Sequence, residues 1–167
     1  MSNFENVIHN RQSIRKYLPH PVPQHKLDRI IDAAIAAPTA ANKQPWFLCI
    51  LKNPKKQLKA IIRQKWVLDA PIVAVIFGEK EAAWIRSWDS LSFHMIDATI
   101  VMDHIILAAT NEGLGTCWIA ANDPEAIRKA CDMEFNYEFL ALTPIGYSAE
   151  SPPKKDRKDK KILVREL

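Results

Sequence analysis

The stretch from Met95 to Ala109 limits the possible folds most, because its apolar side chains do not keep to one face of a helix. We expect it to belong to a long helix that runs from about Trp88 to Glu112 and ends at Gly113, since glycine suits the left-handed conformation that closes many helices. A helix that is apolar on several faces must be buried on several sides. Either the chain's own sheet wraps around it or a second copy covers it, and we predict a homodimer with this helix central or at the interface.

The rest of the sequence indicates one ordinary domain. A chain of 167 residues, 48% of them hydrophobic, can build a core of its own. Asp103 and His104 interrupt the longest apolar stretch, which falls short of the roughly 20 apolar residues that span a bilayer. The first ten residues lack the layout of a signal peptide, and the spacing of Ser2 and Glu5 predicts a capping box that opens a short helix. We expect a single domain over residues 1–167, located in the cytoplasm and without a membrane segment.

Helix and strand patterns alternate along the chain without repeats. Residues 24–37 place apolar side chains on one helical face and stop at Pro38, whereas 46–51 is a short apolar run typical of a buried strand. Asn53 and Pro54 indicate a helix that continues to about residue 63. The later segments are a branched-residue strand at 70–78, a strand or extended turn at 114–120, a short helix opened by Asp123 and Pro124, and a last strand at 139–147. The pattern predicts a mixed α and β domain with about four strands and five helices.

The net charge of +4 comes entirely from the C-terminal segment KKDRKDKK. Residues 154–161 carry six cations and two anions, so the rest of the chain has 17 of each sign. Such a run is usually a solvated tail, and a pI near 9 is also typical of nucleic-acid binding. Because the run contains no interleaved aromatic residues and the body is neutral, we do not expect a nucleic-acid partner.

The three cysteines are widely spaced and lie among apolar residues. Cys49, Cys117 and Cys131 therefore resemble buried reduced thiols more than a disulfide framework. Their spacing to one another and to histidine matches no metal site, and we expect no metal. A catalytic thiolate at Cys117, which lies beside glycines, is the alternative.

A cluster of cations, NRQSIRKY at Asn10 to Tyr17, follows the N-terminal helix. Arg11 and Arg15 present planar forks of donors that suit phosphate oxygens, and Ser13 adds a hydroxyl donor between them. This pattern alone is weak, because Arg-x-Ser-x-Arg occurs by chance on many helix ends. A second segment, APTAANKQPW, carries three side chains that can bond hydroxyls or heterocycle edges, or that form an ordinary polar loop: Thr39, Asn42 and Gln44.

Four segments in register carry a resemblance to a known family. NRQSIRKY, APTAANKQPW, NEGLGTCWIA and PIGYSAESPPKKDRK occur in this order and at intervals that resemble the nitroreductase family of flavin mononucleotide (FMN) enzymes in its short form. The resemblance extends over nearly the whole chain, from about residue 5 to 160. It implies an α+β fold with a central, mostly antiparallel sheet flanked by helices. It also implies an intertwined homodimer with two flavin sites at the subunit interface.

The resemblance also implies which residues bind the flavin. The N-terminal cluster would hold the phosphate together with the tail, the segment after Pro38 would contact the ribityl chain and ring edge of the neighbouring subunit's flavin, and the segment at 118–120 would line the ring. Two positions depart from the family pattern: Ala120 stands where relatives commonly carry glycine, and Asp159 replaces a proline. The implied cofactor-binding residues are Arg11, Gln12, Ser13, Arg15, Pro38, Thr39, Asn42, Gln44, Trp118, Ile119, Ala120, Lys155 and Arg157.

The implied function is an FMN-dependent oxidoreductase that uses NADH or NADPH to reduce a small electron-poor acceptor, nitroaromatic or quinone in type, by ping-pong hydride transfer. We assign no catalytic side chain, because the flavin carries the chemistry. His94 and His104 are more typical of core groups, and Trp84 and Trp88 fall in a loop-like stretch that could cover the substrate face. The alternatives are a flavoenzyme of the same fold with a dedicated substrate, by dehalogenation or flavin fragmentation, and a non-catalytic flavin or nucleotide binder.

Overall fold

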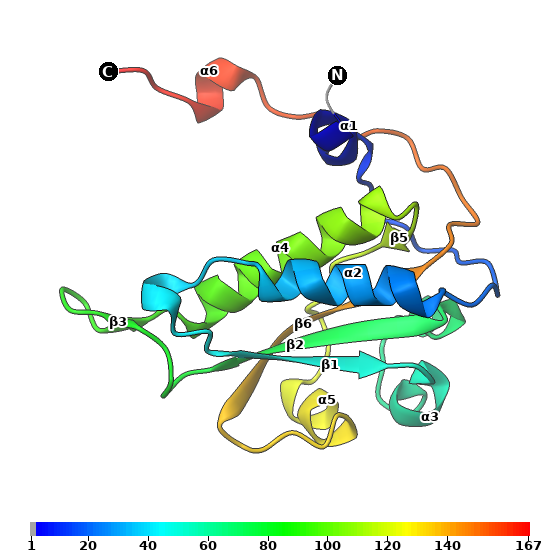
Figure 1. Ribbon diagram of the computed structural model, residues 1–167, viewed down its shortest axis with the longest axis horizontal. Coiled ribbons are helices and arrows are strands. Elements are labelled where there is room, and N and C mark those ends of the chain that lie inside the picture. The colour runs from blue at the N-terminus through cyan, green and yellow to red at the C-terminus, as the bar shows by residue number, and fades with distance from the viewer. Residues whose placement is uncertain (1–2) are drawn as a thin grey trace.

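The computed structural model describes residues 3–167, and its centre is a four-stranded antiparallel sheet with helices on both faces (Figure 1). This architecture confirms the predicted α+β class. The strand order is β1–β2–β6–β5, so the two longest strands, β2 and β6, pair in the middle. The bounds are Trp46–Leu51 for β1, Ile72–Glu79 for β2, Gly115–Thr116 for β5 and Tyr137–Gly146 for β6.

Alternate side chains of the central strand β2 point into two separate cores. Ala74 and Ile76 face the helices α2 (Gln24–Ile35) and α4 (His94–Asn111), and Val75 and Phe77 face α3 (Pro54–Leu58) and α5 (Pro124–Ala130). A strand covered on both faces in this way is apolar along its whole length, because successive side chains alternate between the faces. The sequence shows this as the uninterrupted run at 72–77.

Helix α4 begins later than the sequence predicted. It starts at His94 instead of about Trp88, and the preceding residues form a short hairpin of β3 (Ile85–Arg86) and β4 (Leu91–Ser92). The left-handed φ of 57° at Ser90 and the hydrogen bond from Leu91 N to Asp89 Oδ1 are incompatible with a continuing helix. Trp88 lies at the hairpin's turn and is 91% exposed. The predicted end was right, since Gly113 has φ 73° directly after the helix.

Other elements also differ from the expectations in their bounds or their surroundings. Strand β1 is an edge strand with an exposed Phe47, not a buried strand. Helix α3 ends at Leu58, earlier than the expected end near residue 63, and the amides of Ile61 and of buried Ile62 both bond to the Leu58 carbonyl in the turn that follows. The basic tail contains a short helix, α6 (Lys160–Leu163), that the sequence analysis treated as unstructured tail.

Helix α1 (Asn3–Asn10) and α6 stand apart from the sheet (Figure 1). The predicted N-terminal helix is therefore present, although Ser2 of the expected capping box lies outside the described residues. Both helices expose large apolar side chains, with Phe4 64% and Ile162 71% exposed. Within the described part of the chain, no helix combines the length and apolarity that a membrane crossing needs.

Candidate functional site

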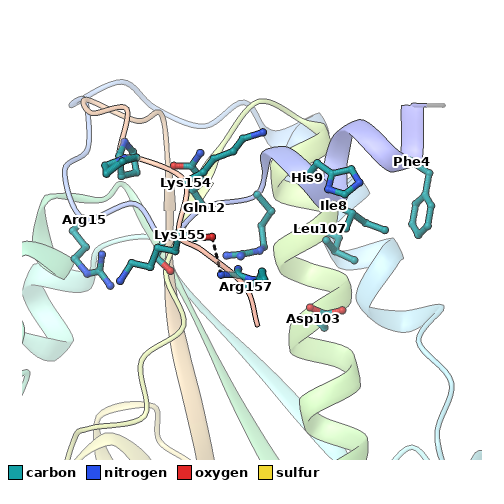
Figure 2. Close-up of a pocket in the computed structure, with 14 residues that line it drawn as sticks. Phe4, Ile8, His9, Gln12, Arg15, Asp103, Leu107, Lys154, Lys155 and Arg157 are labelled. Carbon is teal, nitrogen blue, oxygen red and sulfur yellow. Dashed lines mark hydrogen bonds between the residues drawn. The ribbon is translucent and has the colours of Figure 1, made fainter. Parts of the chain in front are cut away.

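A cavity of about 810 Å³ lies where the two ends of the chain meet. Figure 2 shows Arg15, Lys155 and Arg157 toward one side of it and Asp103 and Leu107 of α4 toward the other. Six of the residues implied by the family resemblance line this cavity, although they come from opposite ends of the sequence. They are Arg11, Gln12, Ser13, Arg15, Lys155 and Arg157.

The N-terminal cluster begins at the last residue of α1, where Arg11 N still donates to the Val7 carbonyl at 3.0 Å, and continues as a segment that lies along β5. Ser13 forms a parallel bridge with Thr116 of β5, and Ile14 N donates to the Thr116 carbonyl at 2.8 Å. Ile14 is buried, whereas Arg11, Gln12, Ser13 and Arg15 all line the cavity. The Arg-x-Ser-x-Arg segment therefore leads from a helix end onto the edge strand β5.

A glycine permits this close approach. A Cβ at Gly115 would lie 2.7 Å from Ile14 Cγ1 and 2.9 Å from Ile14 Cβ, distances that real side chains do not reach. Any larger residue at 115 would therefore push the cationic segment off β5. Tyr17 closes the other end of the segment, because its buried hydroxyl donates to the Ile14 carbonyl at 2.7 Å.

Backbone hydrogen bonds tie the N-terminal segment to the segment that leads into the tail. Leu18 N donates to the Tyr147 carbonyl, and Ala149 N donates to the Lys16 carbonyl, each at 2.9 Å. Arg15 N donates to Glu150 Oε1 at 2.5 Å. These bonds fix the start of the tail beside the arginines, which is why Lys155 and Arg157 can reach the same cavity.

The cations of the cavity lack anionic partners. In residues 3–167, none of the five forms an ion pair with a carboxylate within 4.0 Å. The Arg157 guanidinium reaches only the carbonyls of Lys155 and Asp156, each at 3.3 Å. Asp103 also lines the cavity, but cations gathered without an ion-pair partner still favour binding of an anion, since the anion removes their mutual repulsion. The five cations are Arg11, Arg15, Lys154, Lys155 and Arg157.

Residues 117–120 lie beside this cluster. Burial raises the pKa of the Cys117 thiol, and nearby Arg15, Ser13 and Arg11 only partly oppose the rise. The thiol therefore stays protonated near neutral pH, which argues against the alternative of a catalytic thiolate. Trp118 and Ala120 are exposed next to it, whereas Ile119 points into a core and exchanges both backbone hydrogen bonds with Leu142.

The segment from Pro38 to Gln44 is not part of the cavity within one chain. It contains the 3₁₀ turn η1 (Ala40–Asn42) at the C-terminal end of α2, and the side chains of Asn42 and Gln44 are exposed. Thr39 Oγ1 accepts a hydrogen bond from Gln44 N at 3.0 Å. The structure therefore separates the implied binding residues into three groups: one at the cavity, one on this loop and one at residues 118–120.

The other polar groups singled out in the sequence have structural partners. His94 lies between Ser92 Oγ (3.0 Å) and Glu138 Oε2 (3.1 Å), and His104 Nδ1 contacts the Ile100 carbonyl at 3.0 Å. Over residues 3–167, no cluster of three or more His, Cys, Asp or Glu side chains forms a possible metal site.

Sequence reasoning missed several residues that line the cavity. Two of these residues could have been noticed in the sequence: Lys154 belongs to the basic run, and Asp103 interrupts an apolar helix face. The missed lining residues are Phe4, Ile8, His9, Asp103, Leu107, Pro152, Pro153 and Lys154.

The fold and the cavity define a class of single-sheet α+β proteins with a cationic pocket built from both ends of the chain. The family model described as "Nitroreductase family" matches residues 8–63 and 59–147. The chain belongs to the Nitroreductase family, which confirms the resemblance found in the sequence.

Individual relatives agree with this assignment. A protein of Methanothermobacter thermautotrophicus, provisionally named NADH dehydrogenase/NAD(P)H nitroreductase, is 30% identical over 158 residues, covering 90% of this chain and 80% of that protein. The NAD(P)H-dependent FMN reductase of Bacillus subtilis is 29% identical over 176 residues, covering 94% and 70%. The crystal structure of a nitroreductase family protein from Clostridium difficile superposes with a TM-score of 0.88 at 29% identity, covering 96% of this chain and 95% of that one.

Proposed function

We propose that this protein is an FMN-dependent oxidoreductase that takes electrons from NADH or NADPH and passes them to a small electron-poor acceptor of nitroaromatic or quinone type. The observation that carries the proposal is the group of unpaired cations from both ends of the chain in one cavity. The names of the relatives support the choice of FMN and of a nicotinamide as the electron source.

The cavity residues fit the phosphate and ribityl parts of FMN. Arg11, Arg15, Lys155 and Arg157 supply charge for a dianionic phosphate, and Ser13 supplies a hydroxyl donor. Gln12 Oε1 is buried and has no hydrogen-bond partner among the described residues. A ribityl hydroxyl donating to this oxygen would satisfy it, and a buried polar atom needs such a partner.

The ring-binding part of the site requires a second subunit. Cys117 lies close to Arg11 and Arg15, the residues that follow it offer the exposed surface of Trp118 and Ala120, and the ring would lie there. Pro38, Thr39, Asn42 and Gln44 do not reach the cavity of their own chain, so we assign them to the flavin of the partner subunit. The exposed apolar side chains of α1 and α6, such as Phe4 and Ile162, would be buried in this homodimer.

The protein contributes binding and orientation, while bound FMN supplies the hydride chemistry. The cationic cluster anchors the phosphate, and the exposed loop and Trp118 orient the ring. Ser92, His94 and Glu138 are bonded to one another away from the cationic cavity, so we assign no side chain as general acid or base.

Flavin content and nicotinamide oxidation test this proposal together. The purified protein should show flavin absorbance that NADH or NADPH bleaches and that a quinone or a nitroaromatic restores. Lys155→Ala should lose FMN, whereas Lys158→Ala, the matched change of a lysine outside the cavity, should retain it. Flavin that no nicotinamide reduces would instead indicate the non-catalytic binder, and absence of flavin binding would reject the proposal.

A further inference from the structure

A buried carboxylate, Asp97, lies in the first turn of α4 and contacts the loop from Pro38 to Gln44. Its side chain is 1% exposed, and its Oδ1 accepts a hydrogen bond from Ala40 N at 3.0 Å. The other oxygen, Oδ2, has no partner among residues 3–167. Burying a carboxylate with so few partners is unfavourable, so its position calls for a compensating role.

The loop held by Asp97 has an unfavourable backbone. Three non-glycine residues of the loop have left-handed φ angles: 51° at Ala41, 53° at Asn42 and 50° at Gln44. Such conformations persist only where the surroundings impose them. Because the side chains of Asn42 and Gln44 are exposed, core packing does not impose this conformation.

Hydrogen bonds are what hold the loop. Inside it, Thr39 Oγ1 accepts from Gln44 N, and the Thr39 carbonyl accepts from Asn42 N, both at 3.0 Å. At its far end, the Pro45 carbonyl accepts from Glu79 N at 2.8 Å. At its near end, the Asp97 carboxylate is the only side chain from outside residues 38–46 that bonds the loop in the described part of the chain.

We propose that Asp97 is a positioning residue, whose carboxylate holds Ala40 so that the loop presents Thr39, Asn42 and Gln44 in the conformation that binds the flavin ring and ribityl chain. This inference rests on the proposed function. Asp97 itself touches no ligand. The first turn of an 18-residue helix favours a negative charge, which explains how a carboxylate is tolerated in the core at this point. A charged acceptor also bonds an amide more strongly than a neutral one.

The proposal makes a prediction that separates the loop from the cationic cavity. Riboflavin has the ring and ribityl chain of FMN but no phosphate. Damage to the loop should weaken FMN and riboflavin by the same factor, whereas damage to the cationic cluster should weaken FMN alone. A change that only destabilises the fold should lower the melting temperature without changing either affinity of the folded protein.

The experiment compares three variants in equilibrium titrations of the full-length apoprotein with FMN and with riboflavin. Asp97→Ala should weaken both ligands by about tenfold or more, the effect of losing one charge-assisted hydrogen bond. Asp97→Asn, whose amide oxygen can still accept from Ala40 N but carries no charge, should weaken both ligands clearly less than Asp97→Ala does. Asp123→Ala removes a carboxylate that caps α5 through the amides of Glu125 and Ala126, so it should lower the melting temperature and leave both affinities unchanged.

Several results would overturn the inference. Wild-type affinity for both ligands in Asp97→Ala, with a lowered melting temperature as in Asp123→Ala, would show that Asp97 is only structural. If Asp97→Ala does not fold, Asp97→Leu keeps the number and branching of the side-chain heavy atoms while removing the acceptor, and wild-type riboflavin affinity in that variant would overturn it equally. A wild-type protein that binds neither flavin would reject the proposed function itself, and the inference with it.

Discussion

Replacing Gly115 with alanine should displace the cationic segment and so weaken FMN binding at a position that never contacts the ligand. The new Cβ would lie 2.7 Å from Ile14 Cγ1, and an ordinary contact begins near 3.4 Å. The two segments must therefore separate by 3.4 − 2.7 = 0.7 Å. Rotation of the Ile14 side chain cannot relieve this, because Ile14 Cβ is itself only 2.9 Å away.

Overpacking of this kind costs about 1 to 3 kcal/mol of folding stability. Ser13 and Arg15 flank Ile14 and would move with it, and a displacement approaching 1 Å is enough to impair oriented contacts strongly. We expect Gly115→Ala to lower FMN affinity by about tenfold or more. The assays are FMN titration of the apoprotein and thermal unfolding.

Gly113→Ala is the matched control. Gly113 also has a conformation that suits glycine, with φ 73°, but a Cβ there would meet nothing within 4 Å. This variant should lose about 1 kcal/mol of stability and keep its FMN affinity. Unchanged stability and FMN affinity in Gly115→Ala would refute the reasoning that close contact with β5 positions the cationic segment.

Three further predictions concern pH and the hairpin. FMN affinity should fall as the pH drops below about 6, where the dianion of a phosphate monoester takes up one proton and becomes a monoanion, while riboflavin affinity should not. Parallel curves in titrations at several pH values would contradict the phosphate assignment. The Arg128 side chain lowers the pKa of Glu125 to about 2, with a smaller contribution from Lys129, so this stabilisation is present above the usual glutamate pKa and is lost as the pH falls toward 2. Glu125→Gln should therefore flatten that part of the acid unfolding curve, and an unaltered curve would show that the exposed pair contributes nothing. Trp88→Ser should leave the melting temperature unchanged, because Trp88 is almost fully exposed. If the hairpin covers the substrate, the same variant should have a higher KM for the acceptor. An unchanged KM in steady-state kinetics would show that Trp88 is not part of the site.

Patterns of residues that are close together in the sequence were enough to predict strand β2, the start of helix α5 and the end of helix α4. The branched run at 70–78 predicted a strand, which is β2, and Asp123 followed by Pro124 opens α5 as expected, with the Asp123 side chain accepting from two backbone amides. Gly113 likewise closes α4.

Elements that depend on distant contacts were predicted less well. The sequence from Trp88 to Phe93 suits a helix start, and the left-handed Ser90 that produces the hairpin has no glycine to signal it. The contact of Gly115 with Ile14 joins segments about a hundred residues apart, so spacing alone could not show that the cationic segment lies along β5. The resemblance to the family was what connected the cations of both ends.

The most direct test of the account is the ratio of FMN affinity to riboflavin affinity in the wild type and in Arg157→Ala. If the ends of the chain share one phosphate, losing this guanidinium should reduce the ratio by roughly 10-fold to 150-fold, the value of a charge-assisted bond of about 1.5 to 3 kcal/mol, with riboflavin affinity unchanged. An equal ratio in the two proteins would contradict the claim that the tail binds the phosphate.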